Sequence, residues 1–224
     1  MDNFIPALRD SIFDATYDLT TDYLEVGLDS LLESGVLKEL PIVKTITGLY
    51  KLGQNMYQRN QLKQTLSFIQ GFNMKELNQA KVDQYKEKVF NDPQKCEEEL
   101  GRVMIILDHH IDNIQSKVLG CFFHAYVCGA VSWEKFCELS EANRRMFVAD
   151  YELLRQVSEN SNAEVSEKKQ YQCDRLTSLG LLKNESIVSG SVLYGGSSSP
   201  VIPVGPSLTS FGKTFYQLMR VVNH

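Results

Sequence analysis

Apolar residues recur every three to four positions through most of the first 157 residues, the spacing that aligns them on one face of an α-helix. Phe4 to Leu32 carries such a stripe opposite acidic residues and is expected to form one or two helices. The pattern predicts further helices over 56–72, 74–90, 93–112, 114–128 and 132–157, the last as one helix or as two divided near Ser140. We therefore expect a mainly α protein with an all-helical bundle over residues 1–157.

Polar residues indicate where some of these helices begin and where the bundle ends. In Asn91-Asp92-Pro93 the Asp92 side chain suits the N-cap, and Pro93 suits the first helical position. Ser132 is expected to cap a later helix in the same way. The polar run Ser158 to Glu167 is interpreted as a linker of residues 158–167 between two domains.

Residues 168–224 differ in character from the bundle. A helix is predicted over Gln170 to Leu182, followed by alternating strand-like residues from Val188 to Tyr194. After the turn GGSSSP, Val201 to Val204 is expected to return as a second strand, and Leu208 to Val222 to form a closing helix. This order predicts a small α+β domain.

The segment Gly35 to Asn55 is unusually apolar for a surface helix of a soluble protein. Pro41 limits helix on its N-terminal side, and beyond it the apolar residues fall at helical spacing opposite lysines. A membrane span needs about 20 uninterrupted apolar residues, which the lysines and Pro41 prevent. Burial in the bundle core is the favoured interpretation, and contact with a partner or a membrane surface is the functional alternative. The residues expected to make that contact are Ile42, Lys44, Ile46, Leu49, Tyr50 and Lys51.

Composition restricts the class of protein. The 43% hydrophobic and 23% charged residues are typical of a folded chain. A net charge of -5 disfavours a uniformly basic nucleic-acid binder, although residues 166–224 carry six Lys and Arg against three Asp and Glu. The N-terminus has no pattern of a secretory signal, and the five cysteines include no C-x-x-C pair. We expect a cytoplasmic protein with reduced thiols, with peripheral contact at the inner membrane as a variant of the membrane hypothesis.

Two groups of residues invite a catalytic or metal-binding interpretation. Asp108, His109 and His110 resemble the Asp-His-His of DHH-type phosphoesterases, but the run lies in a helical pattern and no upstream D-x-D supplies a second metal. Cys121, His124 and Cys128 share a helix face, yet structural zinc needs four ligands and the neighbours are aromatic core residues. We therefore expect no metal, no cofactor, no catalytic residue and no enzyme.

The C-terminal region resembles the second half of a winged-helix domain. The resemblance rests on R-L-x-S-L-G-L-L followed by a hairpin and L-T-x-x-G-K-x-F, that is on Arg175, Leu176, Ser178, Leu179, Gly180, Leu181, Leu182, Leu208, Thr209, Gly212, Lys213 and Phe215. In that family the helix before the turn enters the major groove of DNA. The resemblance thus implies DNA contacts by Lys168, Lys169, Gln172 and Arg175, while protein binding by such a domain stays open.

The rest of the chain is similar to small bacterial proteins that share a segment G-x-L-K-[DE]-[IL]-P-I-[IV]-x-T-I-x-G-L-Y-K-x-G-x-N. The matching residues here are Gly35, Leu37, Lys38, Glu39, Leu40, Pro41, Ile42, Val43, Thr45, Ile46, Gly48, Leu49, Tyr50, Lys51, Gly53 and Asn55. The resemblance implies a context of mobile elements and phage defence. We expect a non-enzymatic interaction or effector protein that binds a protein partner or self-associates, and alternatively a winged-helix DNA-binding regulator.

Overall fold

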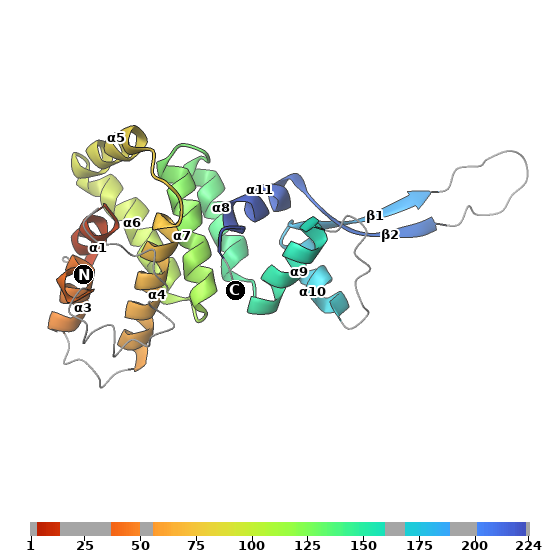
Figure 1. The fold of residues 1–224 in the computed structure, drawn as a ribbon, viewed down its shortest axis with the longest axis horizontal. Coiled ribbons are helices and arrows are strands. Elements are labelled where there is room, and N and C mark those ends of the chain that lie inside the picture. The colour runs from red at the N-terminus through yellow and green to blue at the C-terminus, as the bar shows by residue number, and fades with distance from the viewer. Residues whose placement is uncertain (1–3, 14–36, 50–55, 160–168, 189–200, 223–224) are drawn as a thin grey trace, which may run out of the picture. The chain divides into compact units, whose positions relative to one another are not determined.

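The computed structural model describes residues 4–13, 37–49, 56–159, 169–188 and 201–222 (Figure 1). The described chain is mainly helical with one small two-stranded sheet, which confirms the mainly α class. It divides into two compact units, one of residues 1–145 with 221–224 and one of residues 146–220. The sequence instead predicted a boundary at the linker 158–167, and the difference is that the helix before that linker packs with the second unit.

The first unit is helical over its described residues. Its elements are α1 (Phe4–Phe13), the 3₁₀ turn η1 (Leu37–Glu39), α3 (Pro41–Leu49), α4 (Met56–Asn73), α5 (Gln79–Phe90), α6 (Pro93–Asp108), α7 (Asn113–Val127) and α8 (Trp133–Arg144). No helix among the described residues is both long and apolar enough to cross a membrane.

Two predicted helix starts are confirmed by their caps. The Asp92 carboxylate accepts a hydrogen bond of 3.0 Å from the backbone N–H of Lys95, and Pro93 begins α6. Ser132 Oγ accepts one of 3.2 Å from the N–H of Lys135 at the start of α8. Both bonds satisfy amides that a helix leaves unpaired at its first turn.

The region predicted as a helix or helix pair over 132–157 breaks later than expected. α8 ends at Arg144, and α9 (Val148–Glu159) begins after a short connection instead of near Ser140. The carboxylate of Asp150 accepts the backbone N–H of Phe147 at 2.8 Å, which stabilises the new helix start. Ser140 lies inside α8, where its hydroxyl donates to the carbonyl of Phe136 at 2.7 Å.

The core of the first unit forms where α4 and α7 pack side by side (Figure 1). Two glycines allow a close approach of the helix backbones: an added Cβ at Gly71 would lie 2.7 Å from the carbonyl carbon of Lys117, and one at Gly120 would lie 2.6 Å from the nitrogen of Phe72. Buried aromatic rings fill the space around this crossing. They are Phe68, Phe72, Phe122, Phe123 and Phe136.

Over its described residues, the second unit combines three helices with two paired strands. Its elements are α9, α10 (Gln170–Ser178), β1 (Leu182–Val188), β2 (Val201–Leu208) and α11 (Ser210–Met219). The strands pair antiparallel from Leu182 with Leu208 to Val188 with Val201. β1 thus begins earlier than the predicted strand, of which only Val188 is described and residues 189–194 lie outside the described residues. β2 extends four residues further than predicted although it contains Pro203 and Pro206. The helix predicted over Gln170 to Leu182 ends earlier, at Ser178, and Gly180 follows it with φ +73°.

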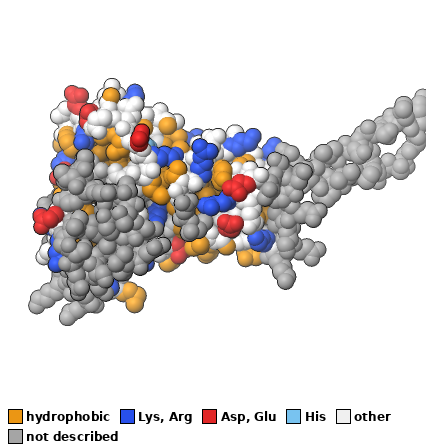
Figure 2. Space-filling model, viewed as in Figure 1, with side chains coloured by type: hydrophobic (Ala, Val, Ile, Leu, Met, Phe, Trp, Pro, Cys, Tyr) orange, Lys and Arg blue, Asp and Glu red, His pale blue; other side chains and the backbone are white. Residues whose placement is uncertain are grey.

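In the described part of the face drawn in Figure 2, acidic and basic side chains are interspersed among hydrophobic ones.

Candidate functional site

The apolar residues of the 35–55 segment that the structure describes lie in the core of the first unit. Ile42 and Ile46, two of the predicted contact residues, are buried on α3, which packs against α1. The backbone N–H of Ile42 also donates to Ser11 Oγ at 2.9 Å. In this fold both isoleucine side chains are therefore buried within their own bundle.

The polar contact residue of this segment, Lys44, is exposed and lies 2.6 Å from the carboxylate of Glu39. The side chain of Leu49, together with Tyr50 and Lys51, lies outside the described residues.

The three residues of the DHH-like run do not converge. Tyr57 donates its hydroxyl hydrogen to the carboxylate of Asp108, and His109 Nδ1 lies 2.7 Å from the carbonyl oxygen of Ile105. His110 is buried, and its Nδ1 lies 2.9 Å from Ser116 Oγ. Because the Ser116 hydroxyl donates to Gln64 Oε1 at 2.7 Å, His110 Nδ1 carries the proton and donates to Ser116. The arrangement anchors the loop between α6 and α7 and offers no shared metal position.

Burial keeps His110 neutral. Desolvation is the main cause that lowers the pKa of His110 to about 4, and the positive charge of Arg144 adds to it. Its Nε2 is buried and has no hydrogen-bond partner among the residues that the structure describes, which an uncharged ring tolerates far better than a protonated one.

Of the three zinc candidates, Cys121 and His124 bind the backbone of a neighbouring helix, and Cys128 Sγ lies 3.5 Å from His124 Nε2. Cys121 Sγ donates to the carbonyl of Gly71, and His124 Nδ1 donates to that of Phe72 at 2.8 Å, so both bind the backbone of α4. Burial raises the pKa of the Cys121 thiol to about 12, which keeps it protonated. Among the described residues no group of three or more His, Cys, Asp and Glu could hold a metal ion.

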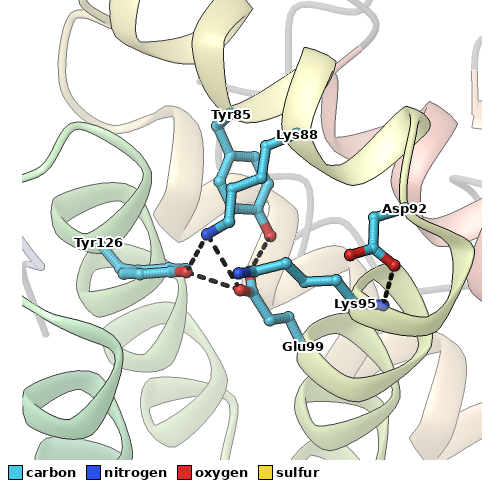
Figure 3. Close-up of polar contacts among 6 residues, drawn as sticks. All are labelled: Tyr85, Lys88, Asp92, Lys95, Glu99 and Tyr126. Carbon is cyan, nitrogen blue, oxygen red and sulfur yellow. Dashed lines mark hydrogen bonds and ion pairs between the residues drawn. The ribbon is translucent and has the colours of Figure 1, made fainter.

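A buried carboxylate cluster joins α5, α6 and α7, and the sequence analysis did not predict it (Figure 3). Glu99 on α6 accepts the hydroxyls of Tyr85 at 2.8 Å and Tyr126 at 2.7 Å, and the ammonium of Lys88 lies 3.2 Å away. Burial, reinforced by the Glu99 carboxylate, raises the pKa of both tyrosines well above the usual value. Glu99 is only 3% exposed, so the cluster serves to hold three helices together.

A pocket of about 450 Å³ lies between α6 and α8 in the first unit. α6 contributes Arg102, Ile105, Ile106 and His109, and α8 contributes Cys137, Ser140, Glu141 and Arg144. The sequence analysis did not single out this pocket, since its two halves are about 35 positions apart in the chain.

Two arginines, Arg102 and Arg144, line the pocket together with one carboxylate, Glu141. Arg144 donates two hydrogen bonds to the Glu141 carboxylate, at 2.9 and 3.0 Å, and Arg145 lies 3.1 Å from the same group. The bonds from Arg144 are the main cause that lowers the pKa of Glu141, and the charges of Arg145 and Arg102 lower it further. Arg144 and Arg145 thus share one carboxylate.

The second unit presents an arginine held between two exposed rings. Arg175 on α10 donates from Nε and Nη2 to the two carboxylate oxygens of Asp150 on α9, both at 2.8 Å. Its guanidinium lies 4.6 Å from the ring centre of Phe147 and 5.6 Å from that of Tyr171. Asp150 is fully buried, whereas Phe147 and Tyr171 are 61% and 62% exposed. We call Phe147, Tyr171 and Arg175 the aromatic–arginine surface.

The remaining residues expected to contact DNA are placed as follows. Gln172 is 4% exposed, and Lys169 Nζ donates to Gln156 Oε1 at 3.2 Å, while Lys168 lies outside the described residues. The exposed positions of α10 instead include Tyr171 and the acidic Asp174. α10 therefore offers little positive charge to a phosphate backbone.

No protein-family model, curated protein or solved structure matches this chain.

Proposed function

We propose that this chain is a non-enzymatic interaction protein that binds a protein partner through the aromatic–arginine surface of its second unit. The observation that carries the proposal is the immobilised Arg175, fixed by two hydrogen bonds to a buried carboxylate between two exposed aromatic rings. Arginine and aromatic residues dominate the binding energy of protein interfaces, and an anchor that is already ordered loses little conformational entropy on binding.

The same contacts define the chemistry of the partner. Asp150 uses Nε and Nη2 of Arg175, and Nη1 makes no hydrogen bond to any residue that the structure describes. A complementary protein surface would present apolar side chains to Phe147 and Tyr171 and one acceptor, a backbone carbonyl or a carboxylate, to Nη1. Asp150 offsets the charge of Arg175, which favours such a surface over the polyanionic backbone of DNA.

The wider context of the proposal comes from the sequence. The order of α10, hairpin and α11 supports a winged-helix-like architecture for the second unit, used here for protein binding. The similarity of the first unit's segment to bacterial proteins near mobile elements suggests a partner in phage defence. Winged-helix DNA binding stays the alternative and is an outcome of the test below.

The test is site-specific photocrosslinking in bacterial cells with a benzophenone amino acid in place of Tyr171. A matched control carries the same group in place of Ile111, an exposed apolar residue of the first unit. We expect a defined protein adduct from the Tyr171 position alone. The identified protein, once purified, should bind the wild-type chain. It should bind the folded Phe147→Ser and Tyr171→Ser variants at least tenfold more weakly.

Three results would overturn the proposal. One is an identical set of adducts from both positions. A second is a purified partner that binds both serine variants as tightly as it binds the wild-type chain. The third is salt-dependent binding to duplex DNA that Lys169→Ala abolishes, which would favour the regulator hypothesis.

A further inference from the structure

We propose that the pocket between α6 and α8 binds a small organic oxyanion that carries a short apolar chain, such as an alkyl phosphate or alkyl carboxylate. This site belongs to the first unit and does not depend on the proposed partner surface of the second.

The lining of the pocket holds two arginines and one carboxylate, which leaves one arginine for an anion. Arg144 and Arg145 are both paired with Glu141, whereas Arg102 is exposed and makes no hydrogen bond or ion pair with any residue that the structure describes. A guanidinium offers parallel N–H groups that match the two oxygens of a phosphate or carboxylate. Arg102 is therefore the residue expected to bind the anionic head directly.

The apolar requirement comes from the wall of α6. Ile105 is 63% exposed and lies beside Ile106 in the pocket, one helical turn from Arg102. Covering this exposed side chain with an alkyl group removes apolar surface from water. The volume of about 450 Å³ lies within the range of about 300–1,000 Å³ that is usual for small-molecule sites.

A cysteine in the pocket supplies a direct readout. Cys137 lines the pocket and is half-buried, and Cys128, also half-buried, does not line it. Both are free thiols, so one sample reports on the pocket and on a reference position. The rate of alkylation at each cysteine is measured by peptide mass spectrometry on the full chain with hexyl phosphate, inorganic phosphate or hexanol.

We expect hexyl phosphate at millimolar concentration to slow alkylation of Cys137 at least fivefold and to leave Cys128 unchanged. Inorganic phosphate should protect more weakly, and hexanol should not protect. Arg102→Ala should shift the half-protecting concentration of hexyl phosphate at least tenfold upward, while Lys81→Ala, which removes one exposed positive charge from α5, should not. Burial raises the pKa of the Cys137 thiol, and the charge of Arg102 partly opposes this rise, so Arg102→Ala also changes the rate without ligand. Protection is therefore expressed as the ratio of the rates with and without ligand in the same variant.

A second variant tests the apolar wall separately. Ile105→Asn should weaken the protection of Cys137 by hexyl phosphate and leave the weaker protection by inorganic phosphate unchanged. Absence of protection at Cys137, equal protection at Cys128, protection by hexanol alone, or unchanged protection in Arg102→Ala would each overturn the proposal.

Discussion

Gly120 on α7 lies against Gly71 on α4 so closely that a Cβ added to Gly120 would be 2.9 Å from the carbonyl carbon of Gly71. Only hydrogen atoms fit between the two backbones at this point. The atoms that a new methyl group would meet are backbone atoms, which cannot turn aside as a flexible side chain could.

Gly120→Ala is therefore expected to destabilise the chain although alanine favours helix. Separation of the helices should lower the free energy of unfolding by about 2–3 kcal/mol. Urea unfolding followed by circular dichroism measures the change. Gly48→Ala on α3, where a Cβ meets nothing within 4 Å, is the control and should be neutral or stabilising. Equal effects of the two substitutions would contradict the close crossing.

Stability is expected to fall with pH on the acid side because of His110. The unfolded chain takes up a proton at His110 near pH 6.5, whereas the folded chain, with a pKa of about 4, does not. The folded state is thus fully favoured above about pH 7 and loses up to about 3 kcal/mol from this group as pH falls to 4. Urea unfolding from pH 4 to pH 8 should show a shallower decline in a folded His110→Asn variant. If the free energy of unfolding of the variant fell with pH as steeply as that of the wild type, His110 would be excluded as the cause.

The stability of the Glu99 cluster is expected to depend on the negative charge of the Glu99 carboxylate, which accepts its hydrogen bonds. Glu99→Gln replaces the carboxylate by a neutral amide and leaves Lys88 without its ion-pair partner. We expect a loss of about 2 kcal/mol in the free energy of unfolding, as for other hydrogen bonds to buried charged groups. Glu98→Gln, on the exposed face of the same helix, should change stability by less than about 0.5 kcal/mol. A similar loss from both changes would mean that the cluster adds nothing.

The two hydrogen bonds from the Arg175 guanidinium to Asp150 are expected to stabilise the fold beyond the effect of the positive charge alone. Arg175→Lys keeps the charge but cannot make both bonds to Asp150 from a planar group, and it should cost about 1–2 kcal/mol. Arg220→Lys, at an exposed position of the second unit, serves as the control. Thermal unfolding of both variants measures the difference. No loss from Arg175→Lys would show that the ion pair does not organise α9 and α10.

Features set by neighbouring residues were predictable from the sequence. The helix starts at Asp92 and Ser132 follow from bonds that span three residues, so a local reading identifies them. The burial of Ile42 and Ile46 likewise agrees with the interpretation favoured from their helical spacing.

Features set by distant residues were not predictable. Asp150 caps α9 and also binds Arg175, a residue 25 positions later, so neither the late helix break nor the aromatic–arginine surface has a local signal. Glu99 lies in the run Glu97-Glu98-Glu99, and only its position between Cys96 and Val103 on the buried stripe of α6 distinguishes it from its neighbours. A Glu at a position of the buried stripe indicates a buried carboxylate, and such a group needs hydrogen-bond donors nearby.

The two prolines of β2 affect how this molecule behaves in a concentrated solution. A strand with an open edge is a template on which another copy can add, and the described residues supply no third strand to cover the hairpin. Pro203 and Pro206 have no amide hydrogen, so β2 cannot donate a continuous row of hydrogen bonds to an incoming strand. The prolines therefore hinder the edge-to-edge addition of another strand along β2.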